Sequence, residues 1–320
     1  MKLWMMSQRT KASGRGFTLL ELLVAISISV VIAGVLLSVA VSTLSVWNRS
    51  NGRWATAATA AVVLDQVESD LQSMTFAPAN GVQLAADILT VTSTSGTWVN
   101  PAKFPKPTGS ANVLVEGSSI ADGRFGTAGV WLRFFIGEAG SGNSSRSMVR
   151  AVSYQIVRRS QTSASGSELA YMLFRSVVTE ENTMKDGYDL SAGEYMIGSG
   201  TFGAAGNVIR PTLTHVIADH VVDFGIRFYR VQGTDQIPYW PATGGSWSNT
   251  VTTLRLRPAA EEVPTMAEVA IWVLTDEGIE QLRLHENQPV GFEPIDDWWG
   301  LVDRYAHVYV RRVRLKAGGR

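Results

Sequence analysis

The sequence predicts an α+β protein in which a long N-terminal helix crosses a membrane and then lies on a β-rich domain outside it. Three observations support this class: an apolar run up to Trp47, a helical apolar pattern beyond it, and, from about residue 82 onward, apolar segments of β character separated by Gly, Ser, Asn and Pro clusters. We therefore expect a basic segment at residues 1–16, a transmembrane half-helix at 17–47, an amphipathic half-helix at 48–76 and a β-rich domain at 82–320.

The apolar run is long enough to cross a bilayer and contains a single charged residue, Glu21. From Phe17 to Trp47 it has about 31 residues, or ~46 Å as a helix at ~1.5 Å per residue. An ionised acid near the middle of a bilayer costs about 2.5 to 3.5 kcal/mol on insertion scales, so we expect Glu21 to have a partner. The residues before the run are basic and include no acid, which predicts a cytoplasmic N-terminus.

A secretory signal peptide is the alternative interpretation of this segment, because Ser38 and Ala40 imitate a small-x-small cleavage site. The apolar stretch before that site is longer than the ~7 to 15 residues of a signal peptide and contains Glu21. The helical pattern also continues past Ala40 without a break. These features favour a retained membrane helix.

The sequence GFTLLE at residues 16–21 resembles the processing site of type IV pilins and of the pseudopilins of type II secretion. The resemblance implies that a prepilin peptidase cuts after Gly16 and N-methylates the new terminus at Phe17. It also implies that Glu21 faces the terminal ammonium of an adjoining subunit. A buried carboxylate is tolerated when it is paired, so this role accounts for an acid in the membrane.

The predicted helix has small residues on two faces and an apolar stripe in its second half. Small residues let helices approach closely in lipid; they are Ala25, Ser29 and Ala33 on one face and Gly34, Ser38 and Ser42 on another. Beyond the membrane, three- and four-residue steps predict that one stripe packs on the domain. Its members are Trp54, Ala57, Ala61, Leu64, Val67, Leu71 and Met74, with Arg53, Asp65, Gln66, Ser69 and Asp70 opposite.

The β-rich domain is expected to contain seven strands and one short helix. The strands are predicted at residues 88–92, 130–135, 149–157, 169–178, 221–229, 269–274 and 306–315, with loops at 96–109, 137–147, 160–167 and 233–249. The loop at 160–167 joins two strands and predicts a hairpin. The helix is predicted at 276–284, with Thr275 as its N-cap and with Ile279 and Leu282 pointing inward.

In the last predicted strand, Val308, Val310 and Val313 alternate with polar and basic residues, so one face is expected to be buried and the other basic and solvated. The chain has no Cys, which excludes thiolate chemistry and means that the domain folds without disulfides. Its formal net charge is zero, so no nucleic-acid partner is expected. The basic cluster formed by Arg311, Arg312, Arg314 and Lys316 is interpreted as a solvated strand face.

Further motifs resemble two pilin-like families. The order of residues 152–156, 173–175, 221–229 and 263–271 resembles minor pseudopilin J of type II secretion, whereas residues 273–277 and 305–316 resemble the Verru_Chthon cassette protein C family. Many type IV pilins close their C-terminal region with a disulfide and major pseudopilins are small, so the resemblance favours a minor pseudopilin. Both families imply a filament or tip component rather than a catalyst.

Catalysis, cofactors and metals are not expected. The GxGxxG match at residues 198–203 lacks room for the helix that a dinucleotide site needs. His215 and His220 are five residues apart, a poor spacing for zinc. Glu293, Asp296, Asp297 and Asp303 offer calcium candidates without EF-hand spacing and favour a solvated acidic loop. An aromatic set is expected in the core, with an exposed contact surface as the alternative; its members are Tyr239, Trp240, Trp247, Trp298 and Trp299.

The sequence therefore favours a minor pseudopilin that joins or caps a periplasmic pseudopilus. The expected partners are other pseudopilins, a prepilin peptidase and inner-membrane lipid, with the chain crossing the inner membrane once and its C-terminal domain in the periplasm. The alternative is a single-pass protein whose domain binds glycan or protein at the cell surface, with the helix as an inert tether.

Overall fold

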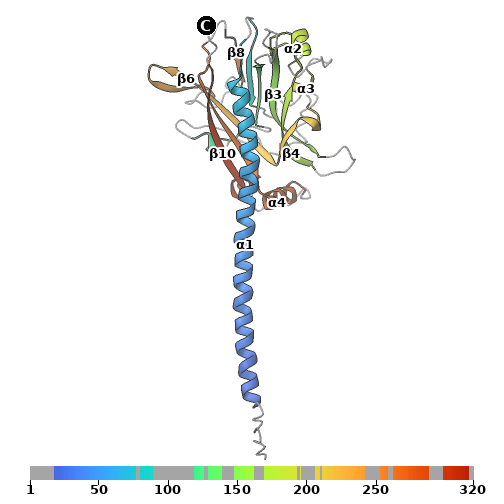
Figure 1. Cartoon of the computed structure of the whole chain (residues 1–320), viewed down its shortest axis with the longest axis vertical. Coiled ribbons are helices and arrows are strands. Elements are labelled where there is room, and N and C mark those ends of the chain that lie inside the picture. The colour runs from blue at the N-terminus through green and yellow to red at the C-terminus, as the bar shows by residue number, and fades with distance from the viewer. Residues whose placement is uncertain are drawn as a thin grey trace, which may run out of the picture. The chain divides into compact units, whose positions relative to one another are not determined.

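The computed structural model describes twelve segments of the 320-residue chain. They are residues 18–76, 80–88, 119–125, 129–138, 148–161, 169–192, 195, 206–209, 211–241, 253–258, 262–287 and 298–316. Helix α1 occupies Leu19–Gln72, and the chain forms two units, residues 1–51 and 52–320. The fold class is α+β, as the sequence predicts (Figure 1).

The part of α1 in the first unit exposes its apolar side chains on every side. Leu19 is 83% exposed and Leu36 is 62% exposed, with the same pattern at each large apolar residue between them. Within the described residues, α1 is long and apolar enough to cross a membrane. Lipid or neighbouring helices would cover this surface, because water does not favour so much exposed apolar area.

The second unit contains two antiparallel sheets. Sheet A has the order β5-β4-β3-β2-β1-β8 and consists of β1 (Leu84–Ile88), β2 (Val130–Glu138), β3 (Met148–Ser160), β4 (Leu169–Val177), β5 (Val216–Asp219) and β8 (Thr253–Leu256). Sheet B has the order β10-β9-β6-β7 and consists of β6 (Val221–Gln232), β7 (Asp235–Trp240), β9 (Met266–Leu274) and β10 (Ala306–Arg314). The sheets meet where Tyr154 stacks on Phe224, with ring centroids 6.1 Å apart.

Short helices surround the sheets. They are α2 (Glu180–Asp186), α3 (Gly206–Ile209), α4 (Asp276–Glu286) and α5 (Trp298–Tyr305). Thr275 caps α4 by accepting a hydrogen bond from the Gly278 amide, which confirms the predicted N-cap. Leu282 is buried and Ile279 is half-buried, so both predicted inward positions contact the domain.

The second half of α1 supplies part of the domain core, but its buried stripe differs from the predicted one. Leu64, Val67, Leu71 and Met74 are buried as expected. Trp54 is 74% exposed and Ala61 is also exposed, so those two assignments were wrong. The buried stripe instead runs through Thr56, Ala60, Val63 and Asp70, because polar partners on the sheets take up the Thr56 hydroxyl and the Asp70 carboxylate.

Asp70 was expected on the polar face and is in fact only 3% exposed. Its carboxylate accepts two hydrogen bonds from the Arg175 guanidinium on β4, at 2.7 and 2.8 Å, and one from the Tyr154 hydroxyl on β3, at 2.5 Å. Burial would lower the pKa of Arg175, but the hydrogen bonds and charge of Asp70 raise it overall. This cluster joins α1 to the middle of sheet A.

A second buried charge lies within sheet A. Arg133 on β2 is fully buried; it pairs with Asp87, donates to the Tyr195 carbonyl at 2.8 Å and lies 3.6 Å from the centre of the Trp131 ring. Burial lowers the pKa of Arg133 to about 10, although the charge of Asp87 opposes that shift. Because Arg255 bonds the other oxygen of Asp87, one carboxylate links three strands.

Most predicted strands occur, and the differences are local. β3 and β4 pair along their length up to Ser160, which lies opposite Leu169, and this pairing confirms the hairpin. The first strand lies at Leu84–Ile88 rather than at 88–92, and residues 89–92 lie outside the described part. The predicted loop at 233–249 contains β7, so that part of the loop assignment was wrong. The elements β5, β8, α2 and α5 were not predicted.

Of the three valines in β10, Val313 is buried at 1% exposed, whereas the other two are on an exposed face. Val308 and Val310 are 37% and 42% exposed. The opposite face contacts α1, where the Tyr309 hydroxyl lies 2.9 Å from the Thr56 hydroxyl and Arg311 pairs with Asp65 and Glu68. The polar side chains on α1 give that face its partners, so polarity alone does not identify the face of β10 that packs on α1.

We predict that Asp70→Ala destabilises the domain strongly, because it leaves the half-buried Arg175 without its carboxylate. The loss should be about 3 to 5 kcal/mol in the free energy of unfolding, measured by urea unfolding of the fragment 51–320. Asp65→Ala is the matched control: Asp65 also pairs with an Arg but its side chain is 70% exposed, so about 1 kcal/mol or less should be lost. Equal losses would contradict the anchoring role of Asp70.

Candidate functional site

The start of α1 forms a reciprocal hydrogen-bonded cap. The Glu21 amide donates to the Thr18 hydroxyl at 3.2 Å, while the Glu21 carboxylate atom Oε2 accepts from the Thr18 amide at 2.9 Å and from its hydroxyl at 3.0 Å. This is a capping box, which satisfies amides that the first turn of a helix leaves without partners. The pattern Thr-x-x-Glu before an apolar run could have revealed it in the sequence.

The expected cleavage site could not be placed in the same way, because Gly16 and Phe17 lie outside the described residues. Of the three residues expected to act in processing and assembly, Glu21 lies in the part of the chain that the structure describes. Both hydrogen bonds to its carboxylate use Oε2, and the other oxygen, Oε1, has no partner among residues 18–76 or the other described segments. A cation on a neighbouring molecule could approach Oε1 without breaking the cap.

Several hydroxyl groups of the apolar segment bond back to the backbone of α1. The hydroxyl of Ser29 donates to the Ala25 carbonyl at 2.8 Å, and Ser27 and Thr43 bond back to the helix in the same way. A Cβ atom placed on Gly34 would meet nothing within 4 Å. The faces are therefore smooth surfaces on which another helix can pack closely.

The calcium candidates do not form a site in the described part of the chain. Asp303 is exposed and bonds the Arg124 guanidinium at 2.6 Å, so its charge already has a partner. Asp296 and Asp297, with Glu293, lie outside the described residues, as does the GxGxxG match at 198–203. Among the residues that the structure describes, no group of three His, Asp or Glu is placed to hold a metal.

The aromatic residues confirm the core assignment where the structure describes them. Trp240, Trp298 and Trp299 are each less than 5% exposed. Tyr239 is half-buried, and Trp247 lies outside the described residues. The rings of Trp298 and Trp299 meet edge to face, with centroids 4.8 Å apart. An exposed aromatic contact surface is therefore not formed by these three Trp residues.

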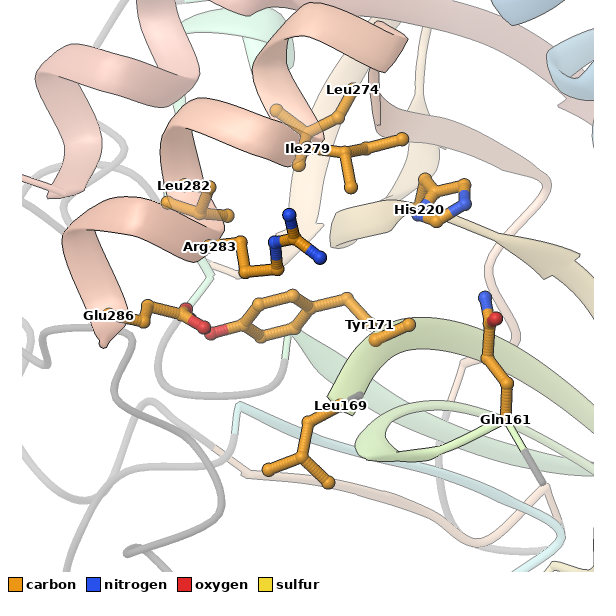
Figure 2. A pocket seen from close by; sticks show the side chains of 10 residues that line it. Gln161, Leu169, Tyr171, His220, Leu274, Ile279, Leu282, Arg283 and Glu286 are labelled. Atoms are coloured by element: carbon orange, nitrogen blue, oxygen red, sulfur yellow. The ribbon is translucent and has the colours of Figure 1, made fainter. Parts of the chain in front are cut away.

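A pocket of about 130 Å³ lies between α4 and the ends of β3 and β4 (Figure 2). At one end the Tyr171 hydroxyl points to the Glu286 carboxylate, 2.6 Å away, and at the other end lie His220 and Gln161. Burial raises the pKa of Tyr171, and the charge of Glu286 adds to that effect.

Glu286 also accepts a hydrogen bond from the Trp298 indole at 3.0 Å and pairs with Arg158. Its carboxylate therefore binds β3, β4 and α5 together. Because the Glu286 carboxylate already bonds Tyr171, Trp298 and Arg158, we interpret its role at the pocket as structural.

His220 adopts a left-handed backbone conformation, with φ 62°, between β5 and β6. Its amide donates to the Tyr171 carbonyl in sheet A at 2.7 Å, and its carbonyl accepts from the Leu274 amide in sheet B at 3.0 Å. The strained residue is thus where the chain passes from one sheet to the other. His215 instead accepts a hydrogen bond from the Thr212 amide, so the two His have separate structural roles.

Residues 12–37 match the family model described as the prokaryotic N-terminal methylation motif. Among solved structures, a type IV-like pilin from Thermus thermophilus is similar to this chain at 10% sequence identity and a TM-score of 0.33. That similarity covers 81% of this chain and 95% of the pilin chain. No curated protein matches the sequence.

We predict that His220 makes the domain less stable in mild acid. Burial lowers the pKa of His220 even though Asp219 and Asp276 oppose the shift. The unfolded chain therefore binds the proton more readily, and the stability that is present above pH about 6.5 is lost as the pH falls. Burial also lowers the pKa of His215 and of His307, so these two residues contribute to stability with the same sign as His220.

His220→Asn is the test variant, because Asn tolerates a left-handed backbone but does not titrate. Its free energy of unfolding, measured in urea from pH 8 to about 5, should fall less steeply than that of the unmodified protein. Parallel curves would show that His220 does not contribute to the pH dependence.

Proposed function

Because the N-terminus of the chain is type IV pilin-like and carries the methylation motif, we propose that the protein is a minor pseudopilin. In this proposal α1 anchors the chain in the inner membrane and the β-rich domain lies in the periplasm. The subunit joins or caps a short pseudopilus of a type II secretion-like system. The observation that carries the proposal is the methylation motif itself, joined to an exposed apolar segment of α1 whose single acid, Glu21, lies in the first turn.

The proposed assembly contact pairs Glu21 with the terminal ammonium of a neighbouring subunit. A prepilin peptidase that cuts after Gly16 would create that ammonium at Phe17. In the single chain the cap from Thr18 engages one carboxylate oxygen and leaves Oε1 without a described partner. In lipid an ion pair is far more favourable than an isolated carboxylate, so the membrane strengthens the contact between subunits.

Two features favour a minor subunit rather than a major one. Removal of residues 1–16 would leave α1 with a large domain, which has ten strands among its described residues. The exposed side chains on the second half of α1, including Trp54 and Val62, would continue the packing surface beyond the membrane. A large domain on a shared helical stem suits a subunit that contacts specific partners at a filament end.

We predict that Glu21→Gln and Glu21→Ala both reduce recovery of partner subunits about tenfold or more, because both remove the charge. They differ in the cap: Gln at this position can still bond the N-cap residue, whereas Ala cannot. Thr18→Ala is the matched control, since it weakens the cap and keeps the carboxylate. The measurement is co-purification of pilin-type subunits from membranes, with carbonate extraction to confirm insertion of each variant.

The pattern across the three variants separates the two roles of Glu21. If Glu21→Gln retains its partners while Glu21→Ala loses them, the residue acts as a helix cap and the ion-pair contact is wrong. If none of the variants changes recovery, Glu21 has no part in assembly, and the tethered-receptor alternative becomes the better account.

A further inference from the structure

The two sheets end in four edge strands, which are β5 and β8 in sheet A and β7 and β10 in sheet B. An edge strand presents unpaired backbone donors and acceptors, and natural proteins shorten, bend or cover such edges to prevent unwanted pairing. The four edges can therefore be compared by their length, regularity and proline content.

Three of the edges are blunted. β5 and β8 have four residues each, and the pairing of β5 with β4 is interrupted by a register shift at Leu173 and Phe174. β7 has six residues, a register shift opposite Phe228 and Tyr229, and a proline, Pro238, that cannot donate a backbone hydrogen bond. None of these three offers a long, regular template to another strand.

β10 is different. Its nine residues pair with β9 in an unbroken register from Ala306 to Arg314, and the strand contains no proline. No strand pairs with its other side among the residues that the structure describes. β-Branched and aromatic residues are frequent in it, which favours an extended conformation.

The hydrogen bonds at the two ends of β10 show which residues face the free edge. The Thr275 amide donates to the Tyr305 carbonyl at 3.1 Å, and the Leu315 amide donates to the Thr265 carbonyl at 2.9 Å. Antiparallel hydrogen-bonded pairs recur at every second residue, so the odd-numbered residues of β10 bond β9. The amides and carbonyls of Val308, Val310, Arg312 and Arg314 therefore point away from the sheet.

The side chains of these four residues are also accessible. Val308 and Val310 are 37% and 42% exposed, Arg314 is exposed, and the Arg312 side chain is 67% exposed although it pairs with Glu268. The free edge thus has an apolar half followed by a basic half. The inward charge on Arg311 does not block it, because that side chain pairs with Asp65 and Glu68 on α1.

We infer that β10 is a docking edge that accepts an extended strand from a neighbouring, different pilin-type subunit. The incoming strand would place apolar residues beside Val308 and Val310 and acidic residues beside Arg312 and Arg314. Main-chain hydrogen bonds supply affinity in such strand addition, and the side chains supply specificity. β10 itself contains no Asp or Glu, so charge complementarity disfavours β10 of a second copy as the incoming strand and favours an acidic strand of a different subunit.

This inference rests on the proposed function in one respect, since it takes the partner to be another pilin-type subunit. The first experiment uses the full-length protein in the membranes of the producing cell. The chain has no Cys, so Val308→Cys and Val310→Cys each introduce a unique attachment point for a benzophenone photocrosslinker. Met184→Cys, on the exposed part of α2, is the control position.

Mass spectrometry of the adducts gives the partner residue at each position. The expected result is that both β10 positions link to one segment of one pilin-type subunit, at residues two positions apart, because side chains on one face of a strand alternate. That segment should contain acidic residues. Met184→Cys should give at most about one tenth of the adduct that Val308→Cys and Val310→Cys give.

The second experiment removes a single outward donor. Val310→Pro deletes the amide that faces the free edge and leaves the bonds of the odd-numbered residues to β9 in place. It should lower recovery of the partner about tenfold while the thermal unfolding midpoint stays within a few degrees of the unmodified value. Val310→Thr keeps the amide and the branched side chain and should bind normally.

The outcomes separate this inference from the proposed function. If Val308→Cys and Val310→Cys give no pilin-type adduct while Glu21→Ala still reduces partner recovery, the docking edge is wrong and the assembly proposal stands. Adducts that join two copies of β10 also overturn the inference. If the adducts map to a protein without a methylated N-terminus and Glu21→Ala has no effect, both proposals are wrong. Should Val310→Pro unfold the domain, the crosslinks alone decide.

Discussion

The bond between Asp70 and Arg175 is the interaction on which the domain most depends, because it fixes one helix against two strands of sheet A. α1 must present a predominantly apolar surface in its first half and a core-forming face in its second half. Apolar packing alone would allow the second half to slide along the sheet. A buried carboxylate with three donors, including the Tyr154 hydroxyl, permits only one register.

Local patterns in the sequence were sufficient to predict the fold class and many of its elements. The apolar run with its single acid, Glu21, predicted the long helix, and the resemblance of residues 16–21 to a pilin processing site predicted the methylation motif; both were confirmed. Thr275 predicted the start of α4 because N-cap chemistry acts within one turn. The β3–β4 hairpin followed from two strong alternating segments on either side of a polar loop.

Features that depend on distant partners could not be predicted in this way. Asp70 and Arg311 looked solvated, but each pairs with an opposite charge more than one hundred residues away in sequence. Gly225 is another example, since a Cβ atom there would lie 2.1 Å from the Phe125 ring. The cap between Thr18 and Glu21 was predictable, because the motif is local, whereas the roles expected for Gly16 and Phe17 stay predictions.

The N-terminal mass of the protein tests the central claim most directly. In cells with an active prepilin peptidase, intact-mass and peptide analysis should find a chain that begins at Phe17 and carries one methyl group on its amino terminus. That result would place the ammonium and Glu21 in one processed helix, as assembly requires. A chain that begins at Met1, or one that begins at Val41 after a signal-peptidase cut, would contradict the pilin-type account.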